Sequence, residues 1–441
     1  MISYSRSLPV RHDVDVFVAG GGPAGVAAAL AANRSGASVF LAEGTCCFGG
    51  MGTSGLVPAF MQFADGEHFL AEGIGREIYD RLWEAKGAGP DDQYNNPMAT
   101  ISIRAEMLKR VYDELMEASD VQFTLMTQMV DVIASDGVVD AVVCSGKSGL
   151  YAVRAKVYVD GTGDGDLAAW AGAAFEKGDD EGKMMAGTLC SLWAGVDWEA
   201  VRASKQRAED ELPRAFEDGI FSVKDRHLPG MWRVGQTVAG GNVGHTFGVD
   251  GTDERSLTEA LIYGRKILTE YERFYRRYMA GYARMELAAT GALLGIRETR
   301  RIVGDYQLNL EDFRRRAVFP DEIGRYAYPV DIHASDPSAE THAKFLEAFQ
   351  SQRLDPGESY GIPYRTLTPR GLSNVLVAGR CISTDRALQG SVRVMPGCYI
   401  TGQAAGVAAT MAANTDADVH EIAVPELQGQ LREMGAYLPN A

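Results

Sequence analysis

Residues 13–43 read DVDVFVAGGGPAGVAAALAANRSGASVFLAE, and the rest of the chain is organised around this stretch. The short apolar run 14–19 is typical of a buried parallel strand, and glycines in a G-x-G-x-x-G frame follow it. An alanine-rich helix, a second strand at 38–42 and the acid Glu43 complete the unit. In such a frame the glycines permit a tight turn, backbone approach to a pyrophosphate, and close packing of helix on strand. The pattern predicts dinucleotide binding; a glycine-rich turn in an ordinary βαβ unit is the alternative.

Glu43 narrows the choice of dinucleotide. It ends the second strand about 20 residues after the glycines. A carboxylate at this position can hydrogen-bond both hydroxyls of an adenosine ribose, and it repels a 2′-phosphate. The sequence therefore favours FAD or NAD over NADP.

Length and charge limit the class of protein. The 441 residues suggest two domains, and the 46% of hydrophobic residues is enough for sizeable cores. The net charge of −16 disfavours nucleic acid and anionic membrane as partners, and solubility is the simplest reason for it. The N-terminus lacks the apolar core of a signal peptide, and no uncharged run reaches membrane-spanning length. We therefore expect a cytoplasmic protein.

Cysteine and histidine usage does not indicate a metal centre. Six cysteines in a chain of this length suggest reduced thiols, and no two of them form a C-x-x-C pair. The seven histidines are scattered along the sequence. We therefore expect no metal site.

Three strands should follow the first unit. They are expected at 121–134, 137–144 and 150–159, separated by SDG and GKSG turns. The last of them runs into the glycine–acid turn DGTGDGD at 160–166 and then into an alanine-rich helix. This arrangement indicates a second element on the nucleotide side, returning to the sheet begun at residue 14.

The chain changes character between residues 175 and 361. Glycine turns thin out there, charge density rises, and a long amphipathic helix is expected over 257–278. A buried strand at 374–378 and a helix at 396–413 then resume the first pattern. The predicted divisions are 11–174 and 362–415 for a discontinuous nucleotide domain, 175–361 for an inserted domain, and 416–441 for a C-terminal extension.

Several blocks of the sequence resemble the FAD-dependent oxidoreductases of the glutathione-reductase-like superfamily. They are GGGPAG with Glu43, VYVDGTGDGDLAAWAGA at 157–173, LGIRETRRIVGDYQL at 294–308, IPYRTL at 362–367, NVLVAGRCIS at 374–383 and SVRVMPGCYITGQAAGVAA at 391–409. The first block is common to many flavoproteins, whereas GIRETRRIVGDY and the C-terminal blocks are more specific. Together they extend over nearly the whole chain.

The resemblance implies an α/β fold. It consists of a Rossmann-like FAD-binding domain with a parallel sheet and a three-stranded β-meander, plus an inserted α+β substrate domain. It also implies FAD, and not NAD, as the tightly held cofactor. It does not identify a substrate, because fold does not fix function.

The same resemblance places the cofactor on the chain. The pyrophosphate should lie on the glycine frame and the ribose on Glu43, with adenine near the backbone of 129–130. The 49–51 turn and the N-terminus of the 396–413 helix should face the flavin. The residues expected to contact FAD are Gly20, Gly22, Pro23, Ala24, Gly25, Glu43, Gly49, Gly50, Met51, Thr53, Val130, Gly163, Asp164, Gly379, Arg380, Met395, Gly397 and Cys398.

Arg297, Arg393 and His245 are the catalytic candidates. In an acidic protein, the cluster GIRETRR and Arg393 could clamp a substrate carboxylate, and on a helix the arginines of that cluster would share a face. Structural pairing with acids or FAD phosphates is the alternative. His245, in the glycine-rich loop GGNVGHTFGVDG, could remove a proton as hydride leaves, or could simply be a loop histidine. Cys46 and Cys47 are expected to be ordinary thiols, with a strained disulfide or a flavin thioether as the alternatives.

These residues predict an FAD-dependent dehydrogenase or oxidase of a small organic substrate that carries a carboxylate. One alternative is an NAD(P)H-dependent flavin reductase acting on a C=C or C=O bond. Another is a flavin-binding subunit without catalysis of its own, working in a partner complex. A homodimer is the simplest expectation for the oligomeric state.

Overall fold

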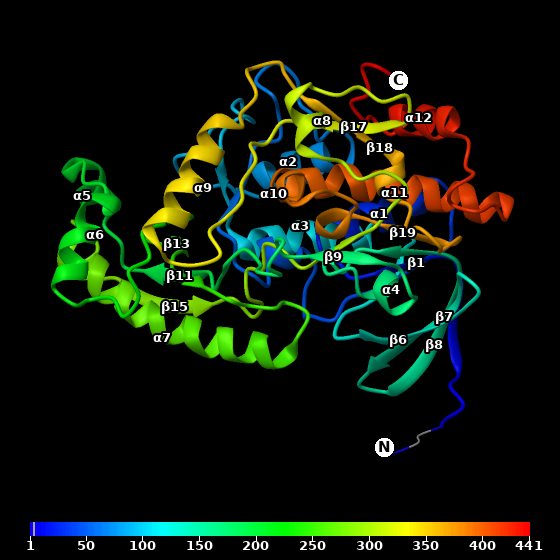
Figure 1. Ribbon diagram of the computed structural model, residues 1–441, viewed down its shortest axis with the longest axis horizontal. Helices are drawn as coiled ribbons and strands as arrows, with labels where there is room; N and C mark the ends of the chain where they lie inside the picture. Colours follow the sequence, from blue (N-terminus) through cyan, green and yellow to red (C-terminus); the bar gives the residue numbers. More distant parts are fainter. Residues whose placement is uncertain (3–4) are drawn as a thin grey trace.

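The computed structural model describes residues 1–2 and 5–441, and its largest sheet has seven strands, of which β1, β19, β6, β7 and β8 are labelled in the right half of Figure 1. Its strands are β1 (Val10–Ala19), β2 (Val39–Ala42), β5 (Gln122–Thr124), β6 (Gln128–Ser135), β7 (Val138–Gly146), β8 (Gly149–Asp160) and β19 (Val375–Val377). The order is β5–β2–β1–β8–β7–β6, with β19 also paired to β8. Strands β5, β2, β1, β8 and β19 run parallel, whereas β6 and β7 continue the sheet antiparallel. The predicted parallel sheet and three-stranded meander are confirmed.

The expectation of one strand over 121–134 is wrong. Met126 has a left-handed backbone (φ +54°), and the chain changes direction there. Its amide donates to the Thr45 carbonyl and the next amide, of Thr127, donates to the Glu43 carbonyl. As a result β5 pairs with β2 on one edge of the sheet, while β6 pairs with β7 on the other.

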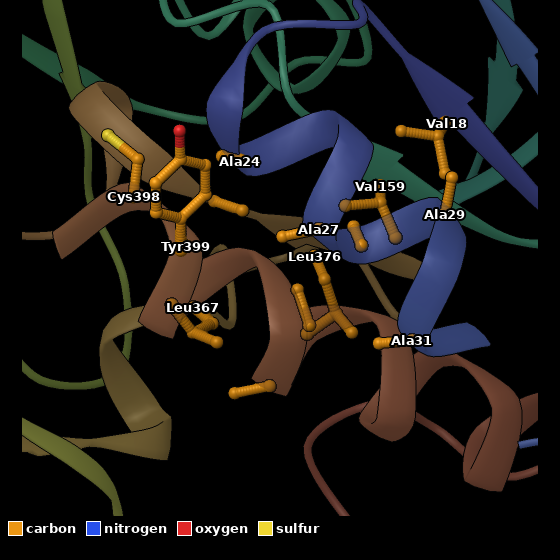
Figure 2. Close-up of a cluster of buried hydrophobic side chains, with 14 of the residues drawn as sticks. Val18, Ala24, Ala27, Ala29, Ala31, Val159, Leu367, Leu376, Cys398 and Tyr399 are labelled. Atoms are coloured by element: carbon orange, nitrogen blue, oxygen red, sulfur yellow. The ribbon is translucent and has the colours of Figure 1, made fainter. Parts of the chain in front are cut away.

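Two buried helices cover the sheet and pack closely on each other. They are α1 (Pro23–Arg34) and α11 (Met395–Thr415), and residues 395–413 are all buried. A Cβ on Gly402 would lie 2.2 Å from the Ala24 carbonyl oxygen, so only glycine permits this approach. Figure 2 shows Ala24, Ala27 and Ala31 of α1 beside the helix that carries Tyr399. The predicted close helix packing is confirmed.

A second hydrophobic core lies at one end of the molecule, in the green region of Figure 1. Its elements are β10 (Gly187–Thr188), β11 (Ser191–Ala194), α5 (Trp198–Ser204), α6 (Ala208–Glu217), β12 (Gly230–Arg233), β13 (Ala239–Asn242), β14 (His245–Thr246), α7 (Glu254–Tyr278) and β15 (Glu286–Thr290). Strands β12–β13–β11–β15 form an antiparallel sheet. The long helix α7 begins after Asp253, whose side chain accepts from the Ser256 amide, and buries one aromatic-rich face.

The remaining elements surround the central sheet. They are β3 (Ala59–Phe60), α2 (Ile74–Glu84), β4 (Ile101–Ser102), α3 (Ala105–Glu117), α4 (Asp166–Trp170), β9 (Phe175–Lys177), β16 (Arg300–Ile302), α8 (Leu310–Arg314), β17 (Glu322–Tyr326), α9 (Ala339–Ser351), β18 (Tyr360–Pro363), α10 (Arg386–Val392) and α12 (Val424–Glu433). The predicted domain divisions stay a prediction. Most buried hydrophobic residues between 302 and 362 belong to the first core and most of those between 189 and 294 to the second, which favours an inserted domain narrower than 175–361.

GIRETRR does not form the helix considered from the sequence. Arg300–Ile302 is strand β16 and pairs with β9, while the Glu298 carboxylate accepts from the Met185 amide. These long-range bonds hold the segment extended. Within residues 1–2 and 5–441, no helix is both long and apolar enough to span a membrane.

Candidate functional site

One cavity of about 930 Å³ connects the glycine turn after β1 to the region between α7 and α9. We call its two parts the nucleotide end, bounded by the glycine frame, Glu43 and residues 127–129, and the histidine end. The histidine end is bounded by Arg297, Arg393, Asp331 and the cavity-lining histidines, with apolar side chains from α7 and α9. The N-terminus of α11 lies between them: Arg393, just before it, pairs with Asp331 at the histidine end, and Cys398 Sγ lies beside Gly379, which approaches Ala24 of the glycine frame.

The glycine frame has the geometry expected from its spacing. Gly20 has a left-handed backbone (φ +87°), as a tight turn requires, and a Cβ on Gly25 would lie 1.8 Å from the Gly20 carbonyl oxygen. By contrast, the nearest atom to a Cβ on Gly22 would be 4.0 Å away, so this position faces open space. In the part of the chain that the structure describes, no side chain caps the first turn of α1, which leaves its N–H groups for a phosphate.

Glu43 is fixed by backbone donors. Its carboxylate accepts from the Gly21 amide at 2.6 Å and from the Thr45 amide at 2.6 Å. Glu43 is 6% exposed and lines the cavity. Because a carboxylate offers about four lone pairs, it retains acceptor sites for ribose hydroxyls.

The junction of the two ends is built from three chain segments. Arg380 donates to the Gly163 carbonyl at 2.8 Å and to the Asp164 carboxylate at 2.6 Å, which joins the turn after β19 to the turn after β8. The first turn of α11 has no side-chain cap. Its free N–H groups and partial positive charge suit an electron-rich ligand edge.

Most of the predicted cofactor residues line this cavity. Those that do are Gly20, Gly22, Pro23, Ala24, Glu43, Gly50, Met51, Gly163, Asp164, Gly379, Arg380, Met395 and Cys398. Gly25, Gly49, Thr53, Val130 and Gly397 are not among the lining residues. The Thr53 hydroxyl instead donates to the Phe48 carbonyl, and Met129 rather than its exposed neighbour Val130 reaches the cavity.

The two preferred arginines both reach the histidine end. Arg297 is 8% exposed and donates to the Ala186 carbonyl at 2.7 Å and the Thr188 hydroxyl at 2.9 Å. Burial and the neighbouring Arg393 lower the pKa of Arg297 to about 10, so it is still cationic at neutral pH. Arg393 donates to the Asp331 carboxylate at 3.2 Å. Arg300 and Arg301, in contrast, pair with Asp166 and Glu298.

Three histidines meet at this end of the cavity. His245 Nε2 lies 3.2 Å from His333 Nδ1, and His227 lies beside both rings. His333 Nε2 is 3.3 Å from the Asp331 carboxylate, and His245 Nδ1 is 3.0 Å from Asp225, although out of line for a good hydrogen bond. His227 and His333 line the cavity, whereas His245, 4% exposed, lies behind them.

Burial determines the charge states of this cluster. It lowers the pKa of His227 to about 3, with help from His245 and Arg297, and it lowers the pKa of His245 despite Asp225. Burial and Arg297 also lower the pKa of His333. For Asp331, burial alone would raise the pKa, but His333 and both arginines outweigh it and lower the pKa. At neutral pH the imidazoles are therefore neutral and Asp331 is ionised.

The chain matches one protein family over most of its length. The family model described as FAD dependent oxidoreductase covers residues 15–431. This chain belongs to that family. FAD is its cofactor.

Solved structures similar to this FAD-dependent oxidoreductase are distant. A geranylgeranyl bacteriochlorophyll reductase-like protein from Thermoplasma acidophilum is 13% identical, with a TM-score of 0.44, over 96% of this chain and 83% of that one. The p-nitrophenol 4-monooxygenase PnpA from Pseudomonas putida DLL-E4 is 12% identical, with a TM-score of 0.43, over 97% and 91%. No curated protein sequence matches the chain.

The cavity fits FAD. The uncapped α1 terminus and open space at Gly22 suit a pyrophosphate, Glu43 suits the ribose, and the uncapped α11 terminus suits the flavin N1–C2=O edge. Of the cysteines considered for a flavin link, Cys46 is exposed and Cys47 Sγ lies 3.2 Å from the Ser54 hydroxyl. Neither is among the lining residues.

Sequence reasoning missed much of the histidine end of this oxidoreductase. It did not single out His227, His333, Asp225 or Asp331. These residues lie in irregular segments far apart in the chain, and no fixed spacing relates them. A weak local signal is the pattern Asp-x-His at 225–227 and 331–333, which also occurs at 418–420, where His420 does not line the cavity.

Proposed function

We propose that this FAD-dependent oxidoreductase dehydrogenates a small organic anion with an apolar body. The observation that carries the proposal is Arg297. Its guanidinium is buried on the cavity wall, and among residues 1–2 and 5–441 no carboxylate lies within ion-pair distance of it. Its hydrogen-bond acceptors, the Ala186 carbonyl, the Thr188 hydroxyl and the Asn242 side-chain oxygen, are all neutral, so an anionic ligand would compensate a buried charge that they leave uncompensated.

The apolar wall supports an apolar substrate body. Leu257 and Leu261 of α7 and Phe345 and Phe349 of α9 line the same cavity, and the Phe345 ring packs beside His227 and His333. A ligand with a carboxylate at Arg297 would lay its carbon skeleton along this wall. The reacting carbon would then lie toward the α11 terminus, where the flavin is placed.

His333, supported by His245, is the proposed proton acceptor. FAD, when bound, supplies the hydride acceptor for the reaction. The substrate proton goes to the cavity-facing His333, which is neutral at neutral pH, and Asp331 stabilises the resulting imidazolium. His245, proposed from the sequence for this role, acts from behind through its 3.2 Å contact with His333.

Anaerobic bleaching of the visible flavin band tests the proposal. The holoenzyme is mixed with hydroxy acids, amino acids and aromatic carboxylates, each beside its neutral amide or alcohol. We expect bleaching by a carboxylate and not by its neutral analogue. In Arg297→Met the rate should fall by roughly 100-fold, because a charge-assisted contact is lost, while FAD stays bound.

Arg365→Met is the matched control, because Arg365 pairs with Asp321 away from the cavity. It should bleach like the unmodified enzyme. Bleaching by NAD(P)H alone would replace the proposal with a reductase. Equal bleaching by charged and neutral analogues would remove the role of Arg297. A flavin that no small molecule reduces would favour a non-catalytic subunit.

A further inference from the structure

The three histidines of the cavity have the spacing of a metal site. One ring nitrogen from each of His227, His245 and His333 can be chosen so that all lie within 4.8 Å of one another. The ring centroids are 4.7, 5.0 and 5.4 Å apart. A tetrahedral ion with nitrogen ligands at about 2.0–2.1 Å separates imidazole centroids by about 5 Å. The centroid separations therefore match those of such an ion, and the His227 ring, which is stacked parallel to His245 at 3°, must turn to direct a nitrogen at the same ion.

The carboxylates around the rings strengthen this interpretation. Asp225 lies at Nδ1 of His245 and Asp331 at Nε2 of His333, on the side of each ring away from the other histidine. The charge of a carboxylate favours the tautomer with the proton on the nearer ring nitrogen, and this holds at His245 even though its contact with Asp225 is out of line for a hydrogen bond. His245 Nε2 and His333 Nδ1 are then both lone pairs, 3.2 Å apart. Such a pair is repulsive unless a cation or a proton lies between the nitrogens.

His227 contributes a third nitrogen ligand and lies on the cavity-facing side of the cluster. Its Nε2 is buried and has no hydrogen-bond partner among residues 1–2 and 5–441, which is costly for a polar group. Both His227 and His333 line the cavity. An ion held by the three rings would therefore have a fourth position directed at the ligand space, as in catalytic zinc sites.

Two nearby arginines oppose a cation. Arg393 is compensated by its pair with Asp331, and Arg297 faces the space proposed for an anion. The groups that contact the outer ring nitrogens are both acidic, namely Asp225 and Asp331. The immediate surroundings of the rings are therefore favourable to a divalent ion.

We propose that His227, His245 and His333 bind one divalent transition-metal ion, with Zn²⁺ best suited to three imidazole ligands and tetrahedral geometry. Its open position faces the histidine end of the flavin cavity. There it can bind an oxygen of the ligand beside Arg297. Metal binding and the proton-accepting role of His333 use the same lone pair, so each excludes the other. The metal site itself does not depend on the proposed reaction.

Metal stoichiometry of the FAD-loaded protein tests this proposal. The holoenzyme is treated with a chelator, dialysed, and titrated with Zn²⁺ or Co²⁺ alone, followed by calorimetry and by elemental analysis after desalting. We expect one ion per chain and a Co²⁺ visible spectrum typical of nitrogen ligands. His245→Gln and His333→Gln should weaken binding by more than about 100-fold, and Asp225→Asn and Asp331→Asn by about 10–100-fold.

His342→Gln is the matched control, because this fourth histidine lies 6.0 Å from the His227 ring and is not part of the triad. It should retain the ion. Thermal unfolding and bound flavin verify that each variant is folded. Absence of Zn²⁺ and Co²⁺ binding by the unmodified protein would overturn the proposal and assign the facing nitrogens to a shared proton. Equal loss in His342→Gln would overturn the three-histidine assignment.

Discussion

The nucleotide end of the cavity is formed mainly by backbone atoms of residues 13–43. The histidine end is formed by polar and charged side chains from segments far apart in the sequence. The first end depends on the absence of side-chain atoms, as at Gly22 and Gly25. The second depends on side chains that hold one another, as Arg393 and His333 do through Asp331. One cavity can therefore combine a cofactor site determined by the local backbone geometry of a contiguous segment with a substrate site determined by tertiary packing.

Gly25→Ala should produce the largest effect, because it disrupts the backbone-built end. The added Cβ would lie 1.8 Å from the Gly20 carbonyl oxygen, so β1 and α1 must separate. We expect a loss of more than about 3 kcal/mol in the free energy of unfolding, together with loss of bound flavin. Urea unfolding and flavin absorbance measure both.

Gly429→Ala serves as the control for this substitution. Gly429 lies in α12, and apart from its neighbours in that helix no atom of the described residues is within 4 Å of the position that an added Cβ would occupy. The substitution should be neutral or stabilising by up to about 1 kcal/mol. Equal behaviour of the two variants would contradict close helix–strand packing at Gly25.

Asp331→Asn should have the second largest effect, and that effect should be confined to the histidine end. The substitution removes the charge that pairs with Arg393 and faces His333. The rate of anaerobic flavin reduction by substrate should fall by about 10–100-fold, because Arg393 and the imidazolium formed on His333 during the reaction lose their fixed partner. FAD content should not change. Loss of FAD would show that the two ends are not independent.

Glu43→Gln should have a smaller effect, confined to the nucleotide end. An amide oxygen can accept from one of the Gly21 and Thr45 amides, but the NH₂ group would face the other. We expect FAD to bind about 10-fold more weakly, with an unchanged reduction rate at saturating FAD. The dissociation constant is measured by flavin fluorescence. A slower reduction rate at saturating FAD would contradict the independence of the nucleotide end from the histidine end.

The smallest effect concerns His420, which lies outside both ends. Burial lowers its pKa, but hydrogen bonds to Asp305 and to the Leu372 carbonyl outweigh burial and raise it. Its stabilising contribution is therefore complete below the ordinary pKa of about 6.5 and is lost as pH rises through the folded-state value. His420→Asn should cost on the order of 1 kcal/mol at about pH 5.5 and less at about pH 9. Urea unfolding at the two pH values tests this, and a cost that grows with pH would contradict it.

The sequence could predict the parts of this molecule that are local. The β1–α1–β2 unit is contiguous, and the glycines Gly20 and Gly25 are required by contacts within the unit and with the turn after β8. The apolar helix α11 is visible from its composition alone. Arg297 and Arg393 could be singled out because they stand in distinctive sequence blocks of an otherwise acidic chain.

The histidine end could not be predicted in the same way. His227, His245 and His333 converge only because β14, the loop before β12 and the segment after β17 fold onto one another. Neither the periodicity nor the spacing of residues in the sequence predicts that these three histidines contact one another. The break at Met126 is another example, because the bonds to Glu43 and Thr45 that redirect the chain are tertiary. The scattered positions of the histidines in the sequence therefore did not exclude a cluster of them in the structure.

The packing of α1 against α11 has a consequence for the order of synthesis. Residues 23–34 emerge from the ribosome early, but the surface that buries them is completed only at residue 415. Until then the nascent chain carries an exposed alanine face and an unfinished pocket, which are features that attract chaperones. Cofactor loading must therefore follow translation of α11, and a ribosome stalled before residue 395 should yield a chain that retains no flavin.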